Sequence, residues 1–180
     1  MEENAKGLAD RGIATLRYQF PYMERGGGRP DPPRIAHSAV RAAAAASASV
    51  AGDLPLFAGG RSYGGRMTSQ AQALAPISAV RGLVFLGFPL HPAGAPATER
   101  ADHLSKIEVP MLFVSGERDA LAEMRLLGAT VRQLGDRAEL FWIRDADHGL
   151  RVSANNGRTS AQAPSEALGR VAGWIDEQLA

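Results

Sequence analysis

The sequence contains no cysteine among its 180 residues, which excludes disulfide bonds, thiolate metal ligands and a cysteine nucleophile. It also contains no apolar run near the roughly 18 residues that a membrane span requires. The opening residues MEENAKGLADRG have the composition of a polar helix rather than of a signal peptide. These absences predict a cytoplasmic protein with no membrane partner.

Charge of one sign is also lacking. The formal net charge is +1 and the 18 arginines are scattered along the chain, so no basic surface for nucleic acid is indicated. No two histidines have the spacing of metal ligands, and we expect no metal and no other cofactor. A chain of this length with 45% hydrophobic residues can bury a sizeable core, which predicts one domain over residues 1–180.

Apolar stretches recur along the chain and predict strands. Most of them are continuous rather than alternating, as in strands that are buried on both faces of a sheet. They cover residues 13–20, 54–58, 82–88, 110–116 and 138–144. Helical patterns lie between and after them, near 34–51, 63–74, 98–106, 120–134 and from Pro164 onward. Alternating strands and helices predict an α/β fold, in which helices cover both faces of a parallel sheet.

One glycine-rich stretch stands where a strand should lead into a helix. Residues 57–67 read FAGGRSYGGRM, and within them Gly60 to Gly64 fit the pattern G-x-S-x-G. In this pattern a strained turn between strand and helix lifts the serine hydroxyl above the sheet, and the glycines let neighbouring backbone approach. Ser62 is therefore a candidate nucleophile. A glycine-rich phosphate-binding turn is the alternative, although the stretch has no G-x-G-x-x-G and no P-loop lysine.

A serine nucleophile needs a base, and the base needs a carboxylate that orients it. Asp119 follows the predicted strand 110–116, and His148 follows the predicted strand 138–144. Both positions lie at carboxyl ends of strands, where open α/β sheets build their sites. We interpret Asp119 as the acid and His148 as the base. Asp147 is a less suitable acid because it adjoins His148 too closely in sequence. Glu117 is less suitable because it falls before the chain has turned at the end of the strand.

Several neighbouring residues have weaker assignments. We expect Asp145 to cap the backbone of the loop that carries His148. His91 lies at the end of the third predicted strand and is a candidate for lining the substrate pocket, with a structural role as the alternative. His37 and His103 fall in helical patterns, and we expect both at the surface. The polar stretch 146–164 is long for a loop, which suggests a functional or mobile segment.

The blocks LRYQFPYMERG, LFAGGRSYGGRMTSQAQA, GLVFLGFPLHPAG, VPMLFVSGERDAL and DADH resemble small bacterial proteins of the α/β-hydrolase fold related to dienelactone hydrolases. Eukaryotic relatives include a subunit of the non-specific lethal histone acetyltransferase complex and a testis-expressed protein. The resemblance covers nearly the whole chain. It implies Ser62 as nucleophile, Asp119 as acid and His148 as base, with the Tyr63 N–H as one oxyanion donor. It implies an acyl substrate of small size without identifying it.

The chain departs from the family pattern in two places. Gly149 and Leu150 follow His148, whereas relatives usually have the sequence DHS followed by an aromatic residue. The family also has upstream strands, one of which ends in an HGAG-like loop that supplies the second oxyanion donor. This chain starts beyond them, and we expect a truncated or misannotated gene product whose sheet has a gap of one strand beside residues 54–58. A bare sheet edge of that kind predicts self-association. The alternative is that the sheet re-pairs, with residues 13–20 beside 54–58.

Two classes of function remain after these observations. The first is a serine hydrolase that acts on carboxylic esters or related acyl compounds through Ser62, His148 and Asp119. The second is a non-catalytic interaction module on the same fold, or a hydrolase inactivated by truncation. A nucleotide-binding flavodoxin-like domain would need a phosphate-binding loop after the first strand, where PYMERGGGRP is rich in proline.

Overall fold

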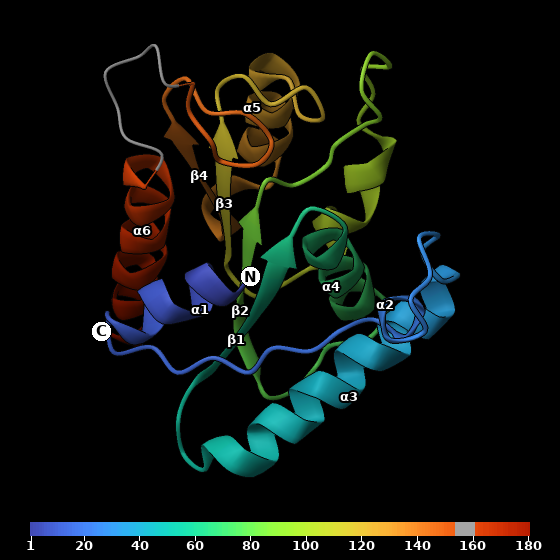
Figure 1. Cartoon of the computed structure of the whole chain (residues 1–180), viewed down its shortest axis with the longest axis vertical. Helices are drawn as coiled ribbons and strands as arrows, with labels where there is room; N and C mark the ends of the chain where they lie inside the picture. Colours follow the sequence, from blue (N-terminus) through green and yellow to red (C-terminus); the bar gives the residue numbers. More distant parts are fainter. Residues whose placement is uncertain (154–160) are drawn as a thin grey trace.

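The computed structural model describes residues 1–153 and 161–180 and contains a four-stranded parallel sheet at its centre (Figure 1). Its strands are β1 (Leu56–Arg61), β2 (Val80–Leu86), β3 (Met111–Gly116) and β4 (Ala138–Ile143). They lie in the order β1-β2-β3-β4, and each pairs in parallel with the next. The predicted α/β class is confirmed. All four strands overlap predicted ones.

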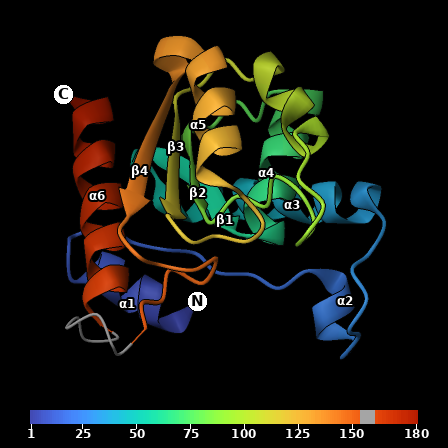
Figure 2. The same ribbon diagram turned by 90° about the horizontal axis from the view of Figure 1, so that it is seen from above.

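Helices connect and cover these strands. They are α1 (Glu2–Ala9), α2 (Pro21–Glu24), α3 (Pro33–Ala51), α4 (Tyr63–Leu74), α5 (Met124–Gln133) and α6 (Gln162–Leu179), with 3₁₀ turns η1 (Glu99–Lys106) and η2 (Gly135–Arg137). α6 and α1 lie on one face of the sheet, and α3, α4 and α5 lie on the other (Figure 2). α4 connects β1 to β2, η1 lies between β2 and β3, and α5 with η2 connects β3 to β4. Parallel strands require such crossover connections.

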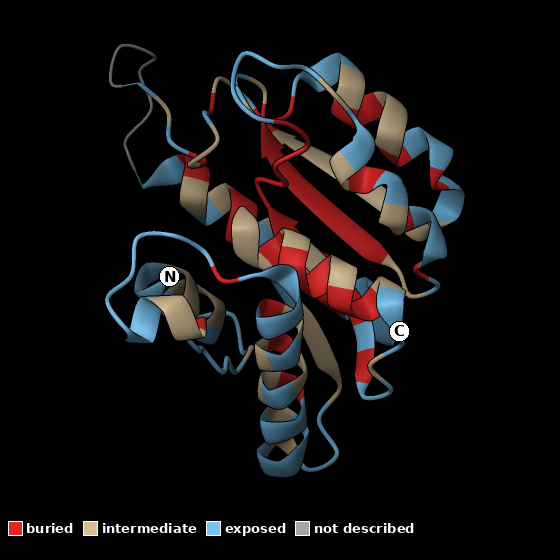
Figure 3. Cartoon of the chain, turned by 90° about the vertical axis from the view of Figure 1, so that its right-hand side faces the viewer, coloured by how far each residue is buried: buried red, intermediate tan, exposed pale blue. Residues whose placement is uncertain are grey.

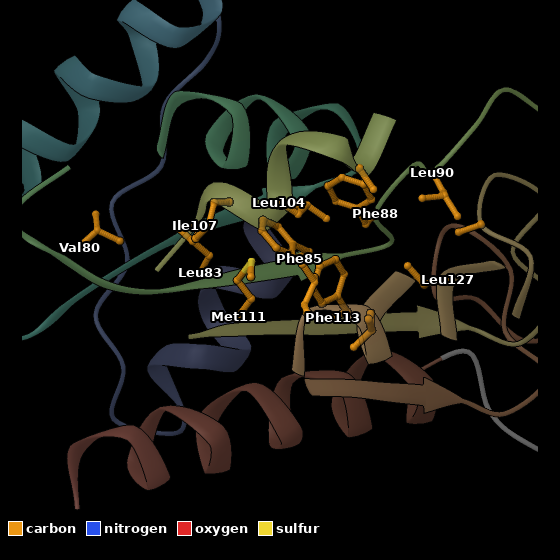
Figure 4. Close-up of a cluster of buried hydrophobic side chains, with 14 residues drawn as sticks. Val80, Leu83, Phe85, Phe88, Leu90, Leu104, Ile107, Met111, Phe113 and Leu127 are labelled. Carbon is orange, nitrogen blue, oxygen red and sulfur yellow. The ribbon is translucent and has the colours of Figure 1, made fainter. Parts of the chain in front are cut away.

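The sheet is buried on both faces, which explains the continuous apolar runs. All six residues of β3 are buried, and Figure 3 shows this central strand enclosed by helices. One cluster joins the sheet to α5 and η1, with Phe85, Phe113 and Leu127 among its members (Figure 4). A second cluster lies on the other face, where Trp174 of α6 packs edge-on against Phe57 of β1 at 5.8 Å between ring centroids.

The predicted strand at residues 13–20 is wrong. This segment is irregular and runs from α1 to α2 beside the sheet (Figure 1). Its composition favours a strand, but among residues 1–153 and 161–180 β1 pairs only with β2, and residues 13–20 pair with no strand. Since strand propensity reflects packing on a sheet rather than an intrinsic backbone preference, a segment without a neighbour stays irregular. Leu16 is accordingly 45% exposed and Tyr18 is 39% exposed.

A groove of about 90 Å³ separates this segment from the sheet edge. Leu16 and Tyr18 line one side of it, and Leu56 to Gly59 of β1 line the other. Residues of α3 and Thr68 of α4 complete its wall. The outer edge of β1 thus lies open beside the groove, at the position where the sequence predicts a gap in the sheet.

The polar stretch 146–164 is described only in part. Residues 146–153 form turns and irregular backbone, α6 begins at Gln162, and residues 154–160 lie outside the described part of the chain. The prediction of a long functional or mobile loop therefore remains a prediction. Within the described ranges, no helix combines the length and apolar character that crossing a bilayer requires.

Candidate active site

Ser62 occupies a strained turn between β1 and α4. Its backbone angles are φ 51° and ψ −119°, so it lies in a region that residues with a side chain rarely adopt. β1 ends at Arg61 and α4 begins at Tyr63, which leaves Ser62 alone at the junction. Its N–H donates to the carbonyl oxygen of Leu86 at 3.1 Å, so that the turn remains attached to β2.

Glycine makes this turn feasible because strand and helix approach closely. A Cβ added to Gly60 would lie 2.9 Å from the carbonyl carbon of Gly64 and 2.9 Å from the nitrogen of Gly65. A Cβ added to Gly65 would lie 2.7 Å from the carbonyl oxygen of Gly60. Side chains at either position would force β1 and α4 apart. The glycines of the motif thus act through backbone packing, as the sequence pattern predicts.

Asp119 follows β3 and is held in place from several directions. Its side chain has no exposed area, and Oδ1 accepts a hydrogen bond of 2.8 Å from the Leu121 N–H. Ser115 of β3 donates its hydroxyl to Oδ2 over a longer 3.4 Å. A buried carboxylate needs such partners, because desolvation without hydrogen bonds is costly. This loop therefore fixes the direction in which the carboxylate faces.

His148 follows β4 on a turn that the backbone stabilises. The Asp147 N–H donates to the Arg151 carbonyl oxygen at 2.9 Å, which closes the turn around His148. The Asp147 carboxylate accepts from the N–H groups of Gly149 at 2.7 Å and Arg151 at 2.9 Å. The residue that caps this loop is thus Asp147. The expectation that Asp145 caps this loop is not met among the described residues: its carboxylate lies 3.8 Å from Arg144 Nε, and its N–H donates to Glu117 Oε2 at 3.1 Å.

The acid loop and the base loop are also joined to each other. The Arg118 N–H donates to the Ala146 carbonyl oxygen at 2.8 Å, and the Glu117 N–H donates to the Ile143 carbonyl oxygen at 3.1 Å. Gly116 allows this approach, because a Cβ there would lie 2.2 Å from the Ala146 carbonyl oxygen. Sequence reasoning considered Glu117 only as an acid and missed its binding to backbone in the neighbouring loop.

The three candidate side chains meet in one hydrogen-bonded chain. His148 Nε2 lies 2.8 Å from Ser62 Oγ, and His148 Nδ1 lies 2.9 Å from Asp119 Oδ1 and 2.8 Å from Oδ2. A carboxylate only accepts hydrogen bonds, so Nδ1 carries the proton and Nε2 is left to accept the serine proton. The His148 side chain is 23% exposed, which leaves the site open to solvent on the imidazole side. This arrangement can activate a serine hydroxyl.

Tyr63 combines a backbone donor with an aromatic contact. As the first residue of α4, it has an N–H without an acceptor inside the helix, and this N–H directly follows the candidate nucleophile. Its ring packs edge-on against Phe20 at 5.3 Å and against Tyr22 at 6.1 Å. Burial raises the pKa of the Tyr63 hydroxyl, and neighbouring Tyr22 adds to this effect. The ring therefore anchors the first turn of α4.

The remaining histidines are less accessible than expected. His91 is only 1% exposed, and its ring nitrogens face the Pro92 carbonyl oxygen and the Glu123 N–H rather than the candidate triad. His103 is half-buried, and its Nε2 lies 2.7 Å from Ser69 Oγ, which corrects the expectation that it is a surface residue. Burial lowers the pKa of His103 to about 4, and the positive charge of Arg66 contributes. His37, also half-buried, faces Gln70 at 3.1 Å.

Other features of the described residues do not coincide with this site. A cavity of about 500 Å³ lies between α5 and β4, and neither Ser62, Asp119 nor His148 lines it. In residues 1–153 and 161–180, His, Cys, Asp and Glu side chains form no group of three suited to a metal ion. The chemistry of this part of the chain therefore concentrates at the carboxyl ends of β1, β3 and β4.

The family of the Alpha/beta hydrolase domain matches residues 1–176. The chain belongs to this family. Its α/β-hydrolase fold also matches a serine hydrolase homologue from Coxiella burnetii at 19% identity and a TM-score of 0.69, covering 98% of this chain and 74% of that one. An esterase domain from Rhodothermus marinus matches at 16% identity and a TM-score of 0.68, covering 96% and 78%.

A third structure, provisionally designated a dienelactone hydrolase from Klebsiella pneumoniae, matches this chain at 18% identity and a TM-score of 0.60. The match covers 89% of this chain and 68% of that one. At these identities, the likeness establishes the fold and no more. The resemblance to the α/β-hydrolase family is thus confirmed at the level of family and fold.

Proposed function

We propose that this chain is a serine hydrolase that acts on carboxylic esters or related small acyl compounds. The observation that supports it is the hydrogen-bonded chain from Ser62 through His148 to Asp119, beginning at a residue with strained backbone angles. Such strain persists only where the surrounding structure imposes it, and it concentrates at functional sites. The family and its esterase neighbours agree with this reaction class.

In the proposed first step, Ser62 Oγ attacks the carbonyl carbon of the ester. A C–O bond forms while the serine proton passes to His148 Nε2, and the carbonyl oxygen becomes an oxyanion. The Tyr63 N–H stabilises that oxyanion. Asp119 holds the Nδ1–H of His148, so the imidazole keeps its orientation and its positive charge is balanced.

The tetrahedral species then collapses. The bond to the alcohol breaks, His148 Nε2 returns its proton to the departing oxygen, and the acyl group remains on Ser62. Water attacks this acyl-enzyme in the second half, with His148 again taking and returning the proton. Acid and Ser62 are released. No redox partner or metal is needed for the balance of atoms and electrons.

Covalent labelling of Ser62 tests this proposal. A fluorophosphonate probe reacts at a useful rate only with an activated serine, so we expect labelling of the wild type and none of Ser62→Ala. Ser105→Ala is the matched control, because the exposed Ser105 hydroxyl donates to the Asp102 carbonyl oxygen away from the candidate triad, and it should label like the wild type. Hydrolysis of p-nitrophenyl acetate should follow the same pattern. Equal labelling of wild type and Ser62→Ala would contradict the proposal.

A further inference from the structure

His91 is a buried polar residue that the proposed reaction does not use. It follows β2 and is 1% exposed. Its Nδ1 lies 2.8 Å from the Pro92 carbonyl oxygen, which can only accept a hydrogen bond, so Nδ1 carries the proton. Nε2 then presents a lone pair to the Glu123 N–H at 3.5 Å, which is a long contact. The imidazole thus spans two loops through backbone groups.

One of these loops carries the candidate acid. The His91 N–H donates to the Leu121 carbonyl oxygen at 3.0 Å, while the Leu121 N–H donates to Asp119 Oδ1 at 2.8 Å. The Ala122 N–H in turn donates to the Asp119 carbonyl oxygen at 3.3 Å. His91 therefore contacts residues 121–123 at both ends, and Leu121 within them holds the Asp119 carboxylate.

The loop that carries His91 also reaches the candidate base. Gly87 begins it with φ 66°, and its N–H donates to the Val114 carbonyl oxygen at 2.8 Å. A Cβ on Gly87 would lie 2.8 Å from the His148 carbonyl oxygen and 3.4 Å from two atoms of its ring. The segment from Gly87 to His91 thus packs against the base at one end and against the acid loop at the other.

We propose that His91 is a positioning residue that keeps Asp119 aligned on His148. The contact that matters is His91 Nε2 to the Glu123 N–H, because among the described residues it is the only hydrogen bond between the His91 side chain and the acid loop. Loss of that acceptor removes the side-chain hydrogen bond to the Glu123 N–H and frees the 119–123 loop to shift. This inference rests on the proposed function. Because His91 is only 1% exposed and its ring faces backbone groups, we expect its loss to lower turnover and to leave substrate binding unchanged.

Two amide substitutions test the roles of Nε2 and Nδ1 of His91 separately. His91→Gln places an amide oxygen near the position of Nε2 and can still accept from Glu123, whereas His91→Asn reaches only as far as Nδ1. Misplacement of a catalytic group by about 1 Å can cost on the order of 10²-fold in rate. We expect His91→Asn to lower kcat at least about tenfold with KM unchanged, and His91→Gln to retain most of kcat.

A second measurement does not depend on turnover. The proton between His148 Nδ1 and Asp119 gives a downfield imidazole resonance in protein labelled with ¹⁵N-histidine, and we expect it to shift or broaden in His91→Asn and to persist in His91→Gln. The inference would be overturned if both variants kept the wild-type kcat and the wild-type resonance. It would also be overturned if both variants lost kcat and the resonance to the same extent. Wild-type protein without Ser62-dependent hydrolysis would count against the proposed function instead, and the resonance would still decide the role of His91.

Discussion

Gly116→Ala should displace the base loop and remove most activity. The added Cβ would lie 2.2 Å from the Ala146 carbonyl oxygen and 2.5 Å from that of Asp147, both of them backbone atoms that cannot rotate away. Ordinary contact begins at 3.4 Å, so the loop must retreat by about 1 Å. His148 Nε2 now lies 2.8 Å from Ser62 Oγ, and this retreat would break that hydrogen bond.

We expect Gly116→Ala to lower kcat for p-nitrophenyl acetate on the order of 10²-fold. Overpacking of this kind also costs about 1–3 kcal/mol in the free energy of unfolding, which urea titration measures. Gly128→Ala is the matched control: it lies inside α5, and its new Cβ would contact only the mobile end of Arg132, at 3.3 Å. That variant should keep full activity and gain about 0.5–1 kcal/mol in stability. Wild-type activity of Gly116→Ala would contradict this prediction.

Two further predictions concern regions outside the candidate triad. Burial lowers the pKa of His103 to about 4, so the unfolded chain binds a proton there below about pH 6.5 and the native protein does not; the free energy of unfolding should therefore fall from pH 6.5 to 4. The full shift in pKa corresponds to about 3 kcal/mol in the free energy of unfolding, which solvent screening at this half-buried site reduces to about 1 kcal/mol. Urea titrations should show a smaller fall in this free energy for His103→Gln than for the wild type. We also propose that a second copy of the chain pairs with the open edge of β1, so sedimentation velocity should detect self-association. Leu16→Lys at the groove should weaken this self-association. Leu74→Lys should not, because Leu74 is 71% exposed and lies outside the groove. A monodisperse monomer at all concentrations would count against this pairing.

The sheet could be predicted from sequence because strands buried on both faces appear as continuous apolar runs. Phe113 and its neighbours in β3 are all buried, and the chain there has no polar alternation that could suggest another structure. Residues 13–20 carry a similar composition and are nevertheless irregular. What they lack is a partner strand. Composition records how well a side chain suits a sheet, and it cannot record whether a neighbouring edge is available.

The candidate triad was predictable for a related reason. Ser62, Asp119 and His148 each follow an apolar run after a few residues, and parallel strands bring their carboxyl ends to one edge of the sheet. Roles that depend on a specific contact were not predictable. Asp145 and Asp147 flank Ala146 with identical side chains, and only the turn geometry decides that Asp147 binds the loop backbone.

Glycines at the ends of β2 and β3 reveal how this site is assembled. Gly87 and Gly116 each leave room where the backbone of the base loop passes, His148 over one and Ala146 over the other. The sequence contains both residues in plain view, at the ends of apolar runs, where glycine is usually taken as a sign that a strand stops. Here Gly87 and Gly116 also determine how closely the base loop packs against the ends of β2 and β3. Because His148 must reach Ser62 and Asp119 at once, its position is fixed by these backbone contacts as much as by its own hydrogen bonds.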